Sequence, residues 1–177
     1  MTASTTGALN AIVDVTRQAV ERSTAAAHVT FRADALPQGA VGSTVRARQH
    51  TVAVDEPPTL GGEDTAINPV ETYLAALLSC QVVTYRFYAE RLGVTIDELD
   101  LSAEGDLDVR GFFGLADDLT GDEVVRPGFS AVRVNVRIVG PDSAERYQEL
   151  TTTVDAHCPV LDLTANPTPV TTTLQVA

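Results

Sequence analysis

Apolar residues are densest in the middle of the chain, where they cover nearly the whole circumference of one helix. This helix opens with an N-cap residue at Asn68, a proline at the first helical position, Pro69, and an acid at Glu71 that can reach back to the cap. It runs to about Leu92, and Gly93 supplies a terminator. A helix that is apolar on nearly every side is predicted to be buried at the centre of a fold.

Alternation of apolar and polar residues predicts strands on both sides of this helix. Before it, residues 28–33 and 44–54 alternate, and the turn from Leu36 to Gly42 between them is typical of a hairpin. After it, residues 99–109 and 129–139 alternate in the manner of long strands with one solvated face.

Two further helices and a last strand complete the pattern. Residues 9–22 predict a peripheral amphipathic helix. Asp142 and Glu145 predict a capping box that opens another helix, which ends before Pro159 because proline disfavours helical geometry in the residue preceding it. Residues 170–176 predict a final strand. The fold class is therefore α+β, with antiparallel sheet wrapped around the buried central helix.

The connection between the two later strands is long. It contains Arg110-Gly111-Phe112-Phe113-Gly114 and an acidic stretch from Asp117 to Glu123. Two interpretations stay open here: a loop with a functional or interface role, or the solvated tip of a hairpin.

The charge balance changes the set of expected partners. All 12 basic residues are arginines, and they stand against 24 acidic residues, for a formal net charge of −12. Such a surface repels nucleic acid and anionic lipid, so we expect neither as a partner. The first residues lack the basic start and apolar run of a secretory signal, and no stretch reaches the roughly twenty apolar residues of a membrane span. We therefore expect a cytoplasmic protein, in which two cysteines are more often catalytic, metal-binding or inert than permanently bonded.

The surroundings of both cysteines resemble one known family. Residues 69–80, PVETYLAALLSC, are similar to the helix that carries the peroxidatic cysteine in osmotically inducible protein C (OsmC) and organic hydroperoxide resistance proteins. Residues 157–160, HCPV, resemble the motif that carries their resolving cysteine. The likeness covers residues 28–177, including Asp-Glu-Pro-Pro and Gly-Gly elements within 55–62, so we expect an OsmC-like domain there and a helical extension in residues 1–27.

The resemblance implies an intertwined homodimer that reduces organic hydroperoxides without a bound cofactor. Cys80 would attack the peroxide as a thiolate, and Cys158 would close a disulfide with the resulting sulfenic acid before further oxidation. A dithiol reductant, such as the lipoyl group of a lipoylated protein, would reopen the disulfide.

The residues themselves leave alternatives open. Without the resemblance, the residues favour an inert core cysteine at Cys80, because an apolar setting disfavours the thiolate. Cys158 would have its thiolate favoured if it caps a short helix starting at Pro159. His157 would either orient or deprotonate Cys158, or only place a charge at a helix C-terminus. A metal site of Cys80, Cys158 and a histidine is a rival, although the ligand spacings typical of such sites are missing.

The sequence departs from the better-known peroxidases of the family at two places. Val70 stands where they have a glutamate, and the hairpin tip has no arginine. Glu71 lies about 180° from Cys80 around the helix and is a cap rather than a catalytic group. The candidate cations are Arg46 and Arg48, which would share one strand face with His50, unless they simply lie at a solvated strand edge. The departures favour a second hypothesis as well: a non-enzymatic protein that binds a small molecule or senses oxidants.

Overall fold

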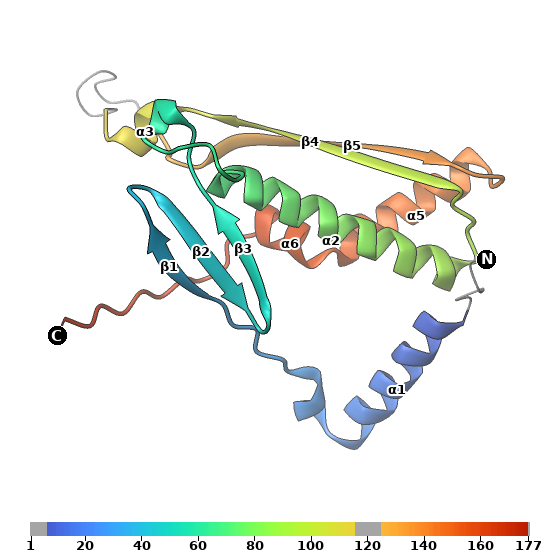
Figure 1. The fold of residues 1–177 in the computed structure, drawn as a ribbon. Coiled ribbons are helices and arrows are strands. Elements are labelled where there is room, and N and C mark those ends of the chain that lie inside the picture. The colour runs from blue at the N-terminus through green and yellow to red at the C-terminus, as the bar shows by residue number, and fades with distance from the viewer. Residues whose placement is uncertain (1–6, 116–124, 177) are drawn as a thin grey trace. The chain divides into compact units, whose positions relative to one another are not determined.

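The computed structural model describes residues 7–115 and 125–176, so the acidic stretch from Asp117 to Glu123 lies outside the described residues. The chain forms two compact units, each described by itself. The first contains residues 7–28, 79–97 and 140–176, and the second contains residues 29–78 with the described part of 98–139. The helix α2, Pro69–Leu92, contributes residues to both (Figure 1). The proposed boundary between residues 1–27 and 28–177 stays a prediction.

The predicted caps of α2 are confirmed. Asn68 N donates to Glu71 Oε2 at 2.9 Å, and Glu71 N donates to Asn68 Oδ1 at 2.8 Å, which is the reciprocal pattern of a capping box. Gly93 follows the helix with a φ of 63°, in the left-handed region that favours glycine at a helix end. The helix is less evenly buried than its sequence predicts, because Leu77 is buried whereas Val83 is 67% exposed.

Helices make up the first unit. They are α1, Ala8–Arg22, the 3-10 turn η1, Thr24–Ala27, the C-terminal half of α2, α5, Ala144–His157, and α6, Pro159–Ala165. Its buried side chains come from α2, α5 and the start of α6, and include Tyr85, Leu150, Val154 and Cys158. The start of α1 has no side-chain cap of its own, and Glu90 Oε1 on α2 accepts instead from three backbone N–H groups there.

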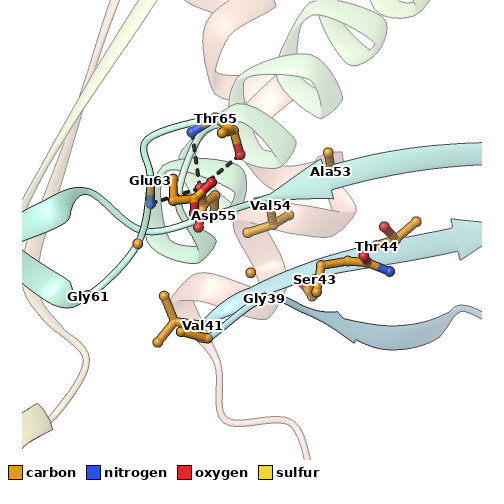
Figure 2. A pocket seen from close by; sticks show the side chains of 14 residues that line it. Gly39, Val41, Ser43, Thr44, Ala53, Val54, Asp55, Gly61, Glu63 and Thr65 are labelled. Atoms are coloured by element: carbon orange, nitrogen blue, oxygen red, sulfur yellow. Dashed lines mark hydrogen bonds between the residues drawn. The ribbon is translucent and has the colours of Figure 1, made fainter.

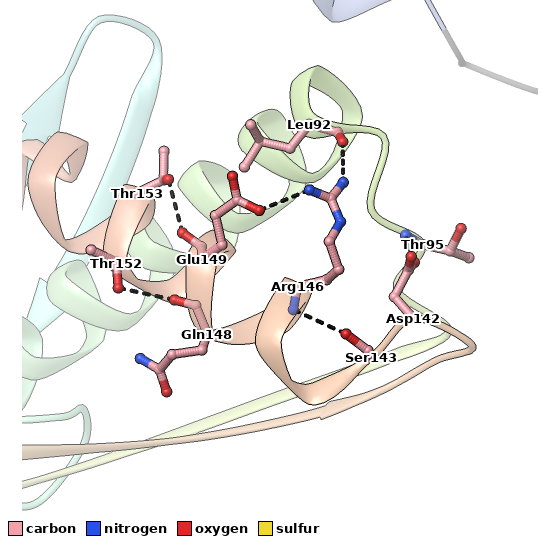
Figure 3. Close-up of polar contacts among 9 residues, drawn as sticks. All are labelled: Leu92, Thr95, Asp142, Ser143, Arg146, Gln148, Glu149, Thr152 and Thr153. Atoms are coloured by element: carbon pink, nitrogen blue, oxygen red, sulfur yellow. Dashed lines mark hydrogen bonds and ion pairs between the residues drawn. The ribbon is translucent and has the colours of Figure 1, made fainter.

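The junction between α2 and α5 is held by polar side chains. Arg146 donates to the carbonyl oxygen of Leu92 at 2.6 Å and pairs with Glu149 at 2.8 Å (Figure 3). The predicted cap at Asp142 is wrong: Ser143 is the N-cap, and its Oγ accepts from Arg146 N at 3.4 Å. Asp142 instead accepts from Thr95 N at 2.7 Å, so its carboxylate is used to hold the loop after α2.

The second unit contains two antiparallel sheets. One has the order β1-β2-β3, with β1 at Asp34–Gln38, β2 at Gly42–Ala47 and β3 at His50–Val54. The other pairs β4, Glu98–Leu107, with β5, Phe129–Val139. Among its described residues this unit also contains the N-terminal half of α2, the 3-10 turn η2, Pro58–Leu60, and the short helix α3, Val109–Phe113. The predicted α+β class with antiparallel sheets is confirmed, and the 129–139 strand has the predicted bounds.

The predicted early strands need correction. Residues 28–33 have no regular secondary structure, and the first strand of the hairpin is β1. The predicted single strand 44–54 is two strands, because the chain turns back at Arg48 and Gln49. Arg48 has a φ of 55° there, and two-residue hairpin turns need such angles. Neither turn residue is the glycine, asparagine or aspartate that usually marks this turn, so the sequence carried no signal for it.

The predicted C-terminal strand is also wrong. Residues 167–176 have no regular secondary structure, and Val170, Leu174 and Val176 are 87%, 83% and 86% exposed. A strand needs a neighbour to receive its hydrogen bonds, and none of the described strands pairs with this segment. No helix in the described part of the chain is long and apolar enough to cross a membrane.

Candidate functional site

The two cysteines lie side by side in the first unit. Cys80 is in the middle of α2, and Cys158 occupies the single residue between α5 and α6. Both are free thiols, and their side chains are within hydrogen-bonding reach of each other. Cys158 is buried, with 1% of its surface exposed, whereas Cys80 is only partly buried. Of this pair, Cys80 is therefore the thiol that a molecule from solution meets more easily.

Proline places Cys158 at its turn. Pro159 forces the preceding residue out of helical geometry, and Cys158 has a φ of −83° and a ψ of 111°. Cys158 thereby ends α5 and caps α6, as predicted, and its carbonyl oxygen accepts from Asp162 N at 2.9 Å. The backbone N–H of Leu161 is directed at its sulfur.

The pKa of the Cys158 thiol is shifted in the direction opposite to the expectation. Burial raises the pKa of the Cys158 thiol, and the neighbouring Cys80 raises it further. Leu161 N–H and the Thr84 hydroxyl, which can donate to the sulfur when it is a thiolate, lower the pKa, but burial outweighs them. The expected benefit of the N-cap position for the thiolate is present, and it is the smaller effect.

Two buried polar residues of α2 were missed by the sequence analysis. Thr84 is 6% exposed, and its Oγ1 donates to the carbonyl oxygen of Cys80 at 2.8 Å. Gln81 is 3% exposed, and its Oε1 has no hydrogen-bond partner among the described residues. The signal for Thr84 was its spacing, because a residue four positions after Cys80 lies on the same helix face.

His157 makes two contacts beside the pair. Its Nδ1 lies 2.8 Å from the carbonyl oxygen of Thr153, and its ring lies 4.8 Å from the ring of Tyr88, measured between centroids. These contacts orient the imidazole towards its own helix and towards α2, so the structure gives more support to a structural role than to deprotonation of Cys158.

Arg46 and Arg48 belong to the second unit, and both are exposed. Arg46 lies in β2 opposite Thr51, whereas Arg48 lies in the turn between β2 and β3. The prediction that they share one strand face with His50 is therefore wrong, because His50 begins the next strand and pairs with Ala47. The role of either arginine at Cys80 stays a prediction.

The rival metal site receives no support from geometry. Within residues 7–115 and 125–176, no three side chains of the types His, Cys, Asp and Glu are grouped to hold a metal ion.

A second polar cluster surrounds Asp55 in the second unit (Figure 2). The carboxylate accepts from Thr65 N at 3.1 Å, Thr65 Oγ1 at 2.8 Å, Glu56 N at 2.9 Å and Glu63 N at 3.2 Å. These bonds, led by those from Thr65, lower the pKa of Asp55 to about 2. The loop and the β1–β2 hairpin line a cavity of about 300 Å³. Because the hydrogen-bond donors of this cluster all bind the Asp55 carboxylate, the cluster stabilises the loop that leads into α2.

The chain is similar to known proteins in sequence and in fold. The family model described as OsmC-like protein matches residues 62–173, which include both cysteines. No curated protein matches the sequence significantly.

Three solved structures illustrate the likeness in fold. The OsmC-like protein of Mycoplasma pneumoniae has a TM-score of 0.65 at 17% identity, over 78% of this chain and 89% of its own. An organic hydroperoxide resistance protein of Elizabethkingia anophelis has a TM-score of 0.58 at 19% identity, over 79% of this chain and 91% of its own. An organic hydroperoxide resistance protein OsmC of Legionella pneumophila has a TM-score of 0.56 at 21% identity, over 76% of this chain and 88% of its own. With the family model spanning more than half of its length, this chain belongs to the OsmC-like protein family.

Proposed function

We propose that the protein is a thiol-dependent peroxidase that reduces organic hydroperoxides through Cys80 and Cys158. The observation that carries this proposal is the pairing of a partly exposed thiol with a buried one in hydrogen-bonding reach. An attacking thiol needs access to substrate, and a resolving thiol needs only access to its partner. Family membership supports the same chemistry, since two of the similar structures are titled organic hydroperoxide resistance proteins.

The reaction divides into three steps. The Cys80 thiolate attacks the terminal oxygen of the hydroperoxide, the O–O bond breaks, and the alkoxide takes a proton and leaves as an alcohol. The Cys158 sulfur then attacks the sulfenic sulfur of Cys80, so that an S–S bond replaces the S–O bond and hydroxide leaves as water after taking a proton. A dithiol reduces this disulfide by exchange and is itself oxidised to a disulfide.

The proposal includes a cation for the Cys80 thiolate. Cys80 lies in the middle of α2, too far from the helix N-terminus to be stabilised by it. Arg46 or Arg48 supplies the positive charge that holds the Cys80 thiolate. Arg46→Ala tests the first, and Arg48→Asn removes the second cation while keeping a residue that tolerates the positive φ.

The protein acts as a homodimer in this proposal. Apolar side chains are exposed along two segments without regular secondary structure: Val29 and Phe31 are 71% and 90% exposed, and Val170 and Leu174 are 87% and 83% exposed. Segments of this kind gain hydrogen bonds and lose apolar surface when a second copy pairs with them.

Turnover with a dithiol tests the proposal. With excess cumene hydroperoxide and dihydrolipoamide, the parent protein consumes many equivalents of peroxide, and Cys80→Ser and Cys158→Ser do not. One of the two arginine variants slows the reaction about tenfold, or about 1.4 kcal/mol in the barrier. Arg137→Ala is the matched control, because that arginine is already paired with Glu98 and Asp100 on β4 and its loss leaves the rate unchanged.

A second candidate function rests on the valine at position 70. If the site lacks a group that the peroxidases of the family use, the thiols serve as an oxidant sensor or the protein binds a small molecule. Oxidation of the pair by one equivalent of hydroperoxide, followed by no further consumption with dithiol present, supports sensing and contradicts the peroxidase. Thiols that do not react at all support simple binding.

A further inference from the structure

Thr84 contacts both cysteines from one position. Its hydroxyl donates to the carbonyl oxygen of Cys80 at 2.8 Å, and the same oxygen lies in hydrogen-bonding reach of the Cys158 sulfur. The residue is 6% exposed, so water does not compete freely for either bond. Both contacts follow from helix geometry: Thr84 is one turn beyond Cys80 on the face that meets Cys158.

We propose that Thr84 controls the resolving step by turning its hydroxyl proton from the Cys80 carbonyl oxygen to the Cys158 sulfur when that sulfur becomes a thiolate. This inference rests on the proposed function, in which Cys158 attacks the sulfenic acid of Cys80. Before the step, the Thr84 hydroxyl is occupied by the carbonyl, and the Cys158 thiol keeps its proton. The proton of Cys158 ends on the hydroxide that leaves the sulfenic sulfur as water. As this proton departs, rotation about one C–O bond brings the Thr84 hydroxyl hydrogen to the new negative charge on Cys158.

The rotation is favoured by the difference between the two acceptors. A hydrogen bond to a charged acceptor contributes about 1.5–3 kcal/mol, against about 1 kcal/mol for one between neutral groups. The carbonyl oxygen of Cys80 loses little, because the backbone N–H four residues ahead also donates to it in a regular helix. Burial opposes the Cys158 thiolate, so a donor that responds to its charge has a large effect there.

Other threonines separate this role from an ordinary structural one. Thr72, Thr151, Thr152, Thr153 and Thr164 donate to the carbonyl oxygen four residues back in the same way. Figure 3 shows this bond for Thr152, which is exposed on α5 with its hydroxyl on Gln148. Thr152→Val therefore removes an equivalent bond without a cysteine beside it and is the matched control.

The test combines a titration with a rate. Thr84→Val keeps the branched shape and removes the hydroxyl, and Thr84→Ser keeps the hydroxyl. The Cys158 thiolate is followed by its ultraviolet absorbance against pH in a Cys80→Ala background, which requires no reagent to enter the core. Disulfide closure is followed in the two-cysteine protein by stopped flow after one equivalent of hydroperoxide. Melting curves establish that each variant is folded, and Thr84→Ala replaces Thr84→Val if the latter is not.

We expect Thr84→Val to move the Cys158 titration to higher pH and to slow closure about tenfold at neutral pH, the factor that corresponds to about 1.4 kcal/mol. Thr84→Ser and Thr152→Val then behave like the parent. The proposal is overturned if Thr84→Val titrates and closes like the parent, or if Thr84→Ser is as impaired as Thr84→Val, since packing then explains the effect. If the parent forms no disulfide, the proposed function fails, and the titration alone decides whether Thr84 donates to the Cys158 thiolate.

Discussion

At Cys158 two physical effects act on a single sulfur atom in opposite directions. The N-cap position directs the N–H of Leu161 at the sulfur, which favours the thiolate, and removal from water disfavours it more strongly. The raised pKa favours the protonated form of the Cys158 thiol at neutral pH. This protects it from the oxidants that Cys80 is proposed to receive.

Asp55 shows the opposite balance, and it predicts an acid-sensitive loop. Four hydrogen bonds from Thr65, Glu56 and Glu63 hold its pKa at about 2, below that of an unfolded aspartate. A depressed folded pKa contributes stability above the unfolded value, near 4, and that stability is lost as the pH falls towards 2. Urea melts between about pH 5 and pH 2 should therefore show a steeper loss in the parent than in Asp55→Asn.

The matched control for this prediction is Glu63→Gln. It changes an exposed carboxylate of the same loop and keeps the backbone N–H that donates to Asp55. Parallel acid profiles for the parent and Asp55→Asn would show that the carboxylate is not held as described.

At the scale of elements, α2 carries the most decisive local signals. Its capping box and terminal glycine were readable from the sequence because cap chemistry depends on residues within one turn. One carboxylate oxygen of Glu71, Oε2, accepts from Asn68 N. Glu71 has no proposed part in the chemistry at Cys80.

Glu71→Ala should thus cost about 1 kcal/mol of unfolding free energy and leave the peroxide reaction unchanged. Glu71→Gln retains an acceptor for Asn68 N and should recover most of the loss. Denaturant melts give the first quantity and single-turnover kinetics the second. Lost peroxide reactivity in Glu71→Ala at parental stability would make the residue catalytic and the assignment wrong.

The elements that the sequence predicted badly share a physical cause. The turn at Arg48 needs a positive φ, which an arginine in the sequence does not indicate. The segment from Val170 to Val176 alternates like a strand, but none of the described strands pairs with it. The contact of Thr84 with Cys158 joins residues 74 positions apart, and spacing along one helix could show only its Cys80 half. The pairing of Cys80 with Cys158 came from a family resemblance, which carries such long-range information.

At the scale of the whole molecule, the unpaired apolar segments predict a dimer. Light scattering at micromolar concentration should give about twice the chain mass of 18.7 kDa. Leu174→Asp should weaken the dimer by placing a charge in the covered surface. Thr173→Asp is the control, because it adds the same charge beside Leu174 and removes no large apolar side chain.

A parent protein that remains monomeric at these concentrations, with a fully cooperative melt, would contradict the proposed dimer. Equal effects of Leu174→Asp and Thr173→Asp would contradict burial of the Leu174 side chain in the dimer.

Disulfide mapping decides whether Cys80 and Cys158 form one redox pair. An equal mixture of isotopically labelled and unlabelled protein is treated with one equivalent of organic hydroperoxide and digested without reduction. We expect a linked peptide pair that contains Cys80 and Cys158, with both partners labelled or both unlabelled, and that disappears on addition of a dithiol. Free thiols after treatment, or links that join labelled to unlabelled peptides, would contradict it.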